Sequence, residues 1–259
     1  METNRDVALL GKAARLETRD SAEWWRAPAL SVHPEIVHGV THASLGNFSL
    51  TTDPDGSAVQ ERRRNVLVAA GLSFARVVAQ PLSHSADVAV VDRGVVPEGK
   101  YDAFVTPDPA TVLAVTVADC VPVFFVDVEQ GAFGVAHAGW RGLAGNIVRS
   151  TVRAMTDQLG TRHGDLLVAV GPAIRGPRYE VGPEVASRFP EQFAVPSGDS
   201  GSGRAFLDLP SCALAQAAAE GVPRENLIDF ALCTFDHKGE LFSHRRGDKS
   251  RHWAFIGRV

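Results

Sequence analysis

Three apolar, β-rich runs follow one another closely in the middle of the chain, and they constrain its fold more than any other feature. They occupy residues 112–117, 121–127 and 132–137. Each run is too continuously apolar for a strand with one face in water, so we expect central strands that are covered on both faces. Further strands are predicted at 36–41, 45–50, 75–79, 87–91, 166–170, 240–244 and 253–256.

Helical signals lie between these strands. Residues 143–159 carry apolar side chains on one side of an amphipathic helix, and a second helix over 57–70 ends at Gly71 as a C-terminal stop. Two shorter helices are predicted at 183–189 and 210–220, and the glycine- and serine-rich stretch 195–204 is predicted to be a mobile loop. Because helices and strands mix without a strict alternation, we expect an α+β architecture with mixed sheets.

The composition and length indicate one globular domain, and the sequence carries no recognisable targeting signal. The 259 residues are 45% hydrophobic, which allows a large core, and we predict one catalytic domain over 31–259. Residues 1–30 are rich in charge and are predicted to be a flexible or loosely docked extension. No apolar run indicates a secretory signal or a spanning helix, so we expect a cytoplasmic protein, monomeric or weakly self-associating.

The charge balance limits the classes of partner. The formal net charge is −4, so no global field attracts nucleic acid or an anionic membrane, and neither partner is expected. An anionic substrate must therefore be held by local groups. The three cysteines are too few and too widely spaced for a secreted disulfide framework, and reduced thiols are expected.

A cysteine and a histidine stand at the ends of the central runs. Cys120 follows Asp119 at the start of the second run, and His137 closes the third. If these strands are antiparallel neighbours, the two side chains share one cleft. The pair could bind a metal, could act as a thiolate nucleophile with its base, or could be buried for structural reasons alone.

His84, at a strand junction, is our candidate for a third metal ligand. Two imidazoles and one thiolate supply three ligands to a borderline-soft ion and leave a fourth position open, as in catalytic zinc sites. The spacing lacks the close ligand pairs of a zinc finger, so on spacing alone buried structural residues remain the alternative.

Several motifs in order along the chain resemble the laccase-domain family, whose members are also described as multicopper polyphenol oxidase-like proteins, purine nucleoside phosphorylases and peptidoglycan editing factors. The motifs are Ala118-Asp119-Cys120-Val121-Pro122, Ala136-His137-Ala138-Gly139-Trp140-Arg141-Gly142, Asp102-Ala103 with Val105-Thr106, Gly171-Pro172-Ala173-Ile174, Tyr179-Glu180-Val181-Gly182, Cys233-Thr234, and Phe242-Ser243-His244-Arg245-Arg246. The resemblance covers most of the chain.

The resemblance implies a single-domain, four-layered α/β/β/α fold and a metal site formed by His84, Cys120 and His137. It also implies zinc-dependent phosphorolysis of adenosine, inosine, guanosine and methylthioadenosine, with adenosine deamination as a second reaction. The sequence departs from the family in four places, two of which are Arg62-Arg63 where the family has Asn-Arg and Ser250-Arg251 where it has Gly-Arg. The first motif is displaced in 80–84, and the usual Gly-Gly loop is absent around 41–45.

Phosphorolysis needs donors for phosphate and for the charge that develops on the departing base. Arg141, close to a proposed ligand, is the first candidate because its planar fork suits phosphate. Asn47 could face the same cleft, Trp140 could stack on a purine, and Asp119 could orient a ligand or cap a turn. The weaker arginine candidates for substrate contact are Arg63, Arg245 and Arg251.

Other functional classes remain as alternatives. Copper-dependent phenol oxidation would need several copper sites, and the nine histidines share few motifs, so we expect zinc rather than copper. A peptidoglycan precursor-editing amide hydrolase would use Cys120 as its nucleophile. A non-enzymatic zinc-binding or partner-binding domain would hold metal without turnover.

Overall fold

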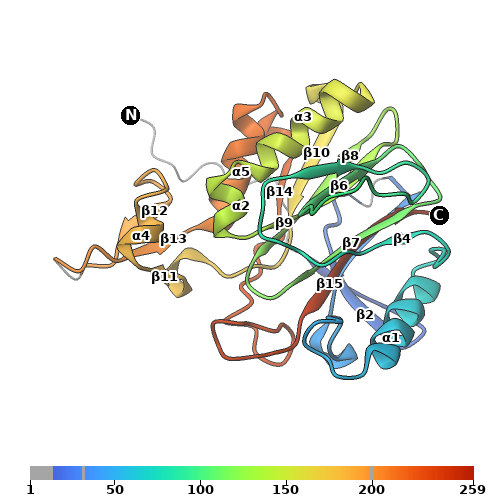
Figure 1. Cartoon of the computed structure of the whole chain (residues 1–259), viewed down its shortest axis with the longest axis horizontal. Coiled ribbons are helices and arrows are strands. Elements are labelled where there is room, and N and C mark those ends of the chain that lie inside the picture. The colour runs from blue at the N-terminus through green and yellow to red at the C-terminus, as the bar shows by residue number, and fades with distance from the viewer. Residues whose placement is uncertain (1–13, 31–32, 199–200) are drawn as a thin grey trace.

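The chain forms four stacked layers, seen from top to bottom in Figure 1 as helices, a sheet, a second sheet and a further helix. The computed structural model describes residues 14–30, 33–198 and 201–259. The upper helices are α2 (Trp140–Ala144), α3 (Ile147–Leu159) and α5 (Leu209–Ala219), and the lower one is α1 (Gly56–Ala69). This order confirms the predicted α/β/β/α fold with mixed sheets.

The sheet beneath the upper helices has the strand order β14-β10-β8-β9-β6-β5. Its pairs are antiparallel except β10–β14 and β5–β6, which are parallel. Every residue of β8 and β9 is buried, as expected for central strands covered on both faces. The bounds are β5 (Val88–Val90), β6 (Ala103–Thr106), β8 (Val121–Asp127), β9 (Phe133–Ala138), β10 (Leu166–Val170) and β14 (Leu227–Asp229).

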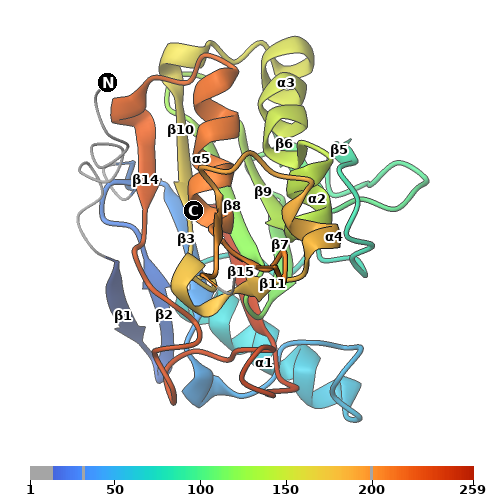
Figure 2. The same cartoon turned by 90° about the vertical axis from the view of Figure 1, so that its left-hand side faces the viewer.

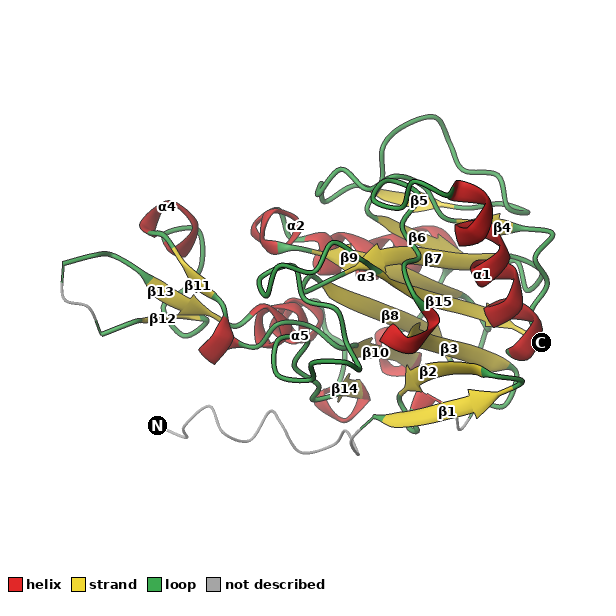
Figure 3. Ribbon diagram, turned by 90° about the horizontal axis from the view of Figure 1, so that it is seen from below, coloured by secondary structure: helices red, strands yellow, loops and turns green. Residues whose placement is uncertain are grey.

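The second sheet has the order β1-β2-β3-β15-β7-β4, and only the β4–β7 pair is parallel. Figure 3 shows α1 lying across its outer face. Phe124 and Phe133 from the first sheet and Ile256 from this one belong to the same buried cluster, so the two sheets share a core. The bounds are β1 (Arg15–Arg19), β2 (Ala22–Arg26), β3 (Ile36–Thr41), β4 (Val77–Val78), β7 (Val112–Val117) and β15 (His252–Arg258).

The N-terminal segment is part of the second sheet, so our expectation of a flexible or loosely docked extension is wrong for residues 15–26. Strand β2 pairs with β3, and Trp24 is only 1% exposed, with its ring 5.9 Å from that of Phe255. The many charges of this segment hid the pattern, because β1 is an edge strand that exposes most of its residues. Residues 1–13 of the predicted extension lie outside the described residues.

Several predicted element boundaries also differ. Residues 45–50 and 240–244 do not form strands, and the helix predicted over 183–189 is shortened to α4 (Pro183–Ala186). The helix predicted over 143–159 is divided into α2 and α3 because Asn146 has a left-handed backbone, with φ of +66°. Asp55 caps α1 by accepting hydrogen bonds from the backbone N–H groups of residues 57 and 58.

A small third sheet projects from the body beside the upper helices (Figures 1 and 2). It comprises β11 (Glu180–Val181), β13 (Ala205–Leu207) and β12 (Ala194–Pro196), with α4 beside it. Part of the predicted loop 195–204 is thus strand, and residues 199–200 lie outside the described residues. Within the described part of the chain, no helix has the length and apolar character needed to cross a membrane. Short 3-10 helices occupy Ala43–Leu45, His163–Asp165, Gly176–Arg178 and Arg224–Asn226.

Candidate metal centre

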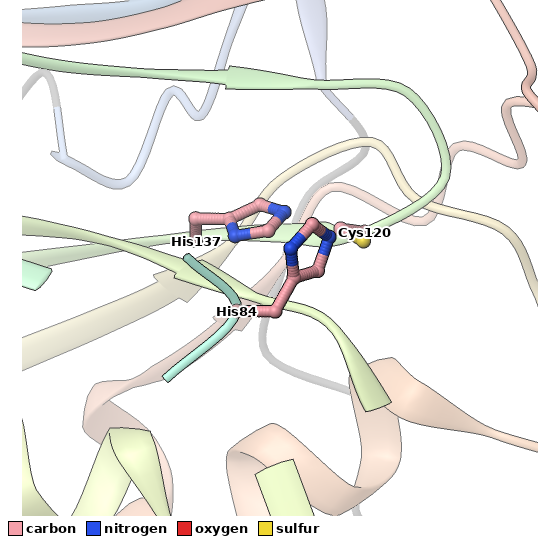
Figure 4. A group of neighbouring side chains, drawn as sticks. All are labelled: His84, Cys120 and His137. Carbon is pink, nitrogen blue, oxygen red and sulfur yellow. The ribbon is translucent and has the colours of Figure 1, made fainter. Parts of the chain in front are cut away.

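His84, Cys120 and His137 converge at one point, as predicted from the sequence (Figure 4). Their possible ligand atoms, the imidazole nitrogens and the cysteine sulfur, all lie within 4.8 Å of one another. The two imidazole rings are 4.8 Å apart and nearly perpendicular, at 80°. This arrangement allows all three side chains to bind a single ion.

Strand pairing explains why the cysteine meets the second histidine. Strands β8 and β9 are antiparallel neighbours, with Val121 opposite Ala138 and Pro122 opposite His137. Cys120 immediately precedes β8, so it lies at the same sheet edge as the end of β9. The expectation that two antiparallel strands would bring these residues together is confirmed.

Asp102 holds the backbone of His84 in position through hydrogen bonds. Its buried carboxylate accepts hydrogen bonds from the backbone N–H groups of Ser83, His84 and Ser85, at 2.9–3.0 Å, and from both serine hydroxyls. His84 has φ of +61°, a left-handed conformation that is uncommon for a residue other than glycine. The carboxylate compensates for this backbone because it satisfies three consecutive N–H donors at once.

The same carboxylate orients His137. The Nδ1 atom of His137 lies 2.9 Å from Oδ1 of Asp102, so a proton on Nδ1 donates to the carboxylate and Nε2 is left free for a metal. Burial alone would raise the pKa of Asp102, but the hydrogen bonds from His137, Ser85 and Ser83 hold that pKa well below its usual range. Asp102 therefore stays charged and connects both histidines.

The sequence alone shows Asp102 only as part of a motif and assigns it no role. The available signal was an aspartate at the start of an apolar strand, where a buried carboxylate requires partners. Which partners it has depends on packing between segments that are far apart in the chain.

The thiol of Cys120 ionises easily. Burial raises its pKa, but the neighbouring imidazoles of His137 and His84 lower it more, to about 6. For His137 burial acts in the other direction and lowers the pKa of the imidazole. The charge of Cys120 and the hydrogen bond to Asp102 outweigh burial and raise that pKa above its usual value. The cysteine is thus a thiolate near neutral pH, which is the form that binds metal.

The donor set fits a catalytic metal ion. One thiolate and two imidazole nitrogens suit a borderline-soft ion such as zinc, and three protein ligands leave a coordination position for substrate. The hydrogen bond between His137 and Asp102 is the kind of outer contact that fixes a histidine ligand in metal sites.

Glycines in the segment after His137 allow the centre to close. A Cβ atom on Gly139 would lie 3.0 Å from the sulfur of Cys120 and 3.4 Å from Cδ2 of His84. A Cβ atom on Gly142 would lie 3.0 Å from the carbonyl oxygen of Ser85. The helix α2 therefore packs directly on the metal ligands and their loop because these positions lack side chains.

Two of the three possible ligands, His84 and Cys120, line a pocket of about 450 Å³. Arg141 is exposed at its rim, with its guanidinium 4.3 Å from the centre of the Trp140 ring. A cavity of about 460 Å³ beside α5 contains none of the ligands. The remaining lining residues of the metal pocket are Ala118, Asp119, Ile174, Tyr179, Leu209, His244 and Arg245.

Arg245 also lines the pocket and is held by several contacts. Its Nη1 donates to the carbonyl oxygen of Glu180 at 2.8 Å, and its guanidinium lies 4.8 Å from the centre of the Tyr179 ring. Its backbone N–H donates to Asp119 at 2.6 Å. Asp119 also accepts a bond from the hydroxyl of Thr234, so this aspartate ties two distant segments to the cysteine loop and forms no hydrogen bond with the histidine ligands.

Three candidates from the sequence do not line this pocket. Asn47 uses its side chain within its own loop and accepts a bond from the backbone N–H of Arg251 at 2.9 Å. Arg63 is buried and lines a separate small cavity. Arg251 is turned toward backbone carbonyls of residues 248–250. Conversely, Tyr179 and His244 line the pocket although the sequence analysis named them only as parts of motifs.

The chain is similar in sequence to known proteins over most of its length. Residues 37–259 match the profile of the family described as multi-copper polyphenol oxidoreductase laccase. A purine nucleoside phosphorylase of Deinococcus radiodurans is 35% identical, over 90% of this chain and 91% of that protein. An adenosine deaminase, RL5, from an unknown prokaryotic organism is 32% identical, over 74% and 78%.

The fold is also similar to a solved structure. The crystal structure of YlmD from Geobacillus stearothermophilus matches with a TM-score of 0.84 and 30% sequence identity. The match covers 94% of this chain and 98% of that one. The fold is thus one that another protein shares over nearly its whole length.

Proposed function

The chain belongs to the multi-copper polyphenol oxidoreductase laccase family, and from this premise we propose that it is a zinc-dependent purine nucleoside phosphorylase. The observation that carries the proposal is the convergence of His84, Cys120 and His137 beside a pocket whose rim bears two arginines. Relatives over most of the chain carry the name purine nucleoside phosphorylase, and one is named an adenosine deaminase. The proposed substrates are adenosine, inosine, guanosine and methylthioadenosine, with adenosine deamination as a side activity.

In phosphorolysis a phosphate oxygen forms a bond to C1′ of the ribose while the bond from C1′ to the purine nitrogen breaks. The electron pair of that bond leaves with the purine. Arg141 and Arg245 both line the pocket, and their guanidinium groups would hold the phosphate by charge-assisted hydrogen bonds. The ring of Trp140, also in the pocket, offers an apolar face for a purine.

His84, Cys120 and His137 would hold the zinc ion, with Asp102 keeping Nε2 of His137 free for it. When bound, the ion supplies Lewis-acid stabilisation of the negative charge that develops on substrate atoms. The residues around it act by position: the α2 segment closes over the ligands, and the thiolate of Cys120 balances part of the ion's charge.

A peptidoglycan precursor-editing amide hydrolase is the second candidate, because the lowered pKa of Cys120 and the adjacent His137 would also suit a thiolate nucleophile. Copper-dependent polyphenol oxidation is less favoured. Such oxidases need several copper sites, and the described residues contain one cluster of three potential ligands.

The first experiment is turnover of inosine and adenosine by metal-quantified protein, with and without phosphate. Phosphate-dependent release of hypoxanthine and ribose 1-phosphate from inosine is expected. Inosine formed from adenosine would report deamination. Zinc-loaded protein that converts neither nucleoside would refute the proposal and favour the hydrolase or a metal-binding module.

Single substitutions of two separate cysteines provide a test variant and its matched control. Cys120→Ala should lose bound metal and activity together, whereas Cys212→Ala should retain both, because burial raises the pKa of Cys212 to about 12 and it lies in α5. Full metal occupancy in Cys120→Ala would contradict the ligand assignment. The reaction needs only small molecules as partners, and a cytoplasmic location and a monomeric or weakly associated state stay predictions.

A further inference from the structure

Arg63, on α1, is a buried cation without a carboxylate partner among the described residues. Its side chain is 5% exposed, and its Nη2 donates to the carbonyl oxygen of Phe48 at 2.8 Å. Its guanidinium lies 5.3 Å from the centre of the Trp253 ring. The buried Nε has no hydrogen-bond partner in the described part of the chain. These contacts leave the charge uncompensated.

Other arginines that are partly buried are paired differently. Arg62, the neighbour of Arg63, contacts Asp53, and Arg175 forms a two-pronged pair with Asp229. Burial lowers the pKa of Arg63 to about 10, so it is still charged at neutral pH. A buried charge without a partner is costly, which makes an external anion favourable at this place.

The lining of the cavity beside Arg63 combines apolar residues with several hydrogen-bond donors and contains no acidic residue. Its volume is about 60 Å³, enough for a group of a few heavy atoms. The oxygen of Ser49 accepts two backbone N–H bonds, from residues 51 and 52, so its own proton remains available to donate. Thr51, Gln80 and Thr116 add further polar groups to the lining.

We propose that this Arg63 cavity binds a small oxyanion of the class of inorganic phosphate, with Arg63, Ser49 and Thr116 as donors. The cavity lies next to the metal pocket along two segments of the chain. Leu82 and Thr116 line the Arg63 cavity, whereas His84 and Ala118, two residues further on, line the metal pocket. The inference does not require the phosphorylase reaction.

Equilibrium dialysis of the full chain against radiolabelled inorganic phosphate tests the proposal. We compare the unmodified chain with Arg63→Met and with Arg64→Met, a control whose guanidinium is exposed and lies 5.2 Å from the centre of the Phe74 ring. Arg63→Met should lose roughly tenfold to a hundredfold in affinity at one site, as expected for charged hydrogen bonds, and Arg64→Met should bind normally. Arg63→Met binding with unchanged affinity and stoichiometry would overturn the proposal.

Arg63→Lys keeps the test valid if the methionine variant does not fold. Lysine retains the charge but not the fork of donors, so intermediate affinity is expected, and normal affinity would count against the assigned geometry. Thermal unfolding with added phosphate gives a second readout, because an anion that binds the folded chain raises the melting temperature. That rise should be smaller in both Arg63 variants than in Arg64→Met.

Arg141→Met separates this site from the phosphate site proposed for catalysis. Phosphate binding that falls in Arg141→Met but not in Arg63→Met refutes the Arg63 cavity and leaves the proposed function standing. Binding that depends on Arg63 in a protein without nucleoside turnover supports the cavity and counts against the proposed function. If ribose 1-phosphate displaces the labelled phosphate, the cavity accepts the phosphate group of a sugar ester. If it does not, the cavity binds only the free phosphate ion.

Discussion

Replacing Asp102 by asparagine tests whether one buried carboxylate organises the whole metal centre. The substitution keeps the size of the side chain but exchanges one acceptor oxygen for an NH₂ donor. One carboxylate oxygen now accepts bonds from the N–H groups of Ser83 and Ser85, and the other from the N–H of His84 and from Nδ1 of His137. Whichever oxygen is replaced, a new donor faces two existing donors.

The magnitude follows from these contacts. At least one buried N–H loses its acceptor, at about 1–3 kcal/mol each, and a buried charged hydrogen bond is lost as well. We expect Asp102→Asn to lower the free energy of unfolding by about 3 kcal/mol. If the amide donates to Nδ1 of His137, the imidazole changes tautomer and Nε2 carries the proton. Zinc affinity should then fall by roughly tenfold to a hundredfold.

Two measurements check this expectation. Urea denaturation in the presence of a chelator reports the stability of the metal-free chain, and competition with a chromophoric chelator reports zinc affinity. Asp87→Asn is the matched control, because its side chain is exposed and makes no hydrogen bond in the described part of the chain. An Asp102→Asn protein with the urea midpoint and zinc affinity of Asp87→Asn would show that the carboxylate does not organise the site.

Three further predictions concern a buried histidine, a glycine beside the metal centre and a tryptophan of the N-terminal strands. Burial, with the charge of Arg26, lowers the pKa of His38 to about 3, below the 6.5 of an unfolded chain, so stability present above pH 6.5 is lost as the pH falls. The loss should reach about 2 kcal/mol at pH 5 and be absent in His38→Gln, as measured by denaturation at both pH values. Gly139→Ala should lower zinc occupancy, measured by elemental analysis, because the new methyl group would meet the cysteine sulfur, whereas Gly164→Ala has open space around it and should bind normally. Trp24→Ala should lower the free energy of unfolding, measured by urea denaturation, by about 3–5 kcal/mol. A change below about 1 kcal/mol would mean that the N-terminal strands are not part of the core.

The local pattern of the sequence was sufficient where apolar residues follow one another without interruption. The apolar runs that became β7, β8 and β9 could be placed almost to the residue, because strands buried on both faces admit few polar side chains. Elements with mixed patterns were less predictable. Strand β1 exposes its charged residues at a sheet edge, and the irregular segment 45–50 has the composition of a strand without pairing as one.

At the candidate metal centre, the sequence was sufficient to predict the three possible ligands. The motifs around Cys120 and His137 and the histidine at position 84 predicted a site that the strand pairing then brings together. Only the tertiary structure decided that Asp102 supports both histidines and that Arg63 faces a cavity of its own. The physical reason is that a motif records which donor atoms are present, whereas the partner of a buried carboxylate or guanidinium depends on how distant segments pack.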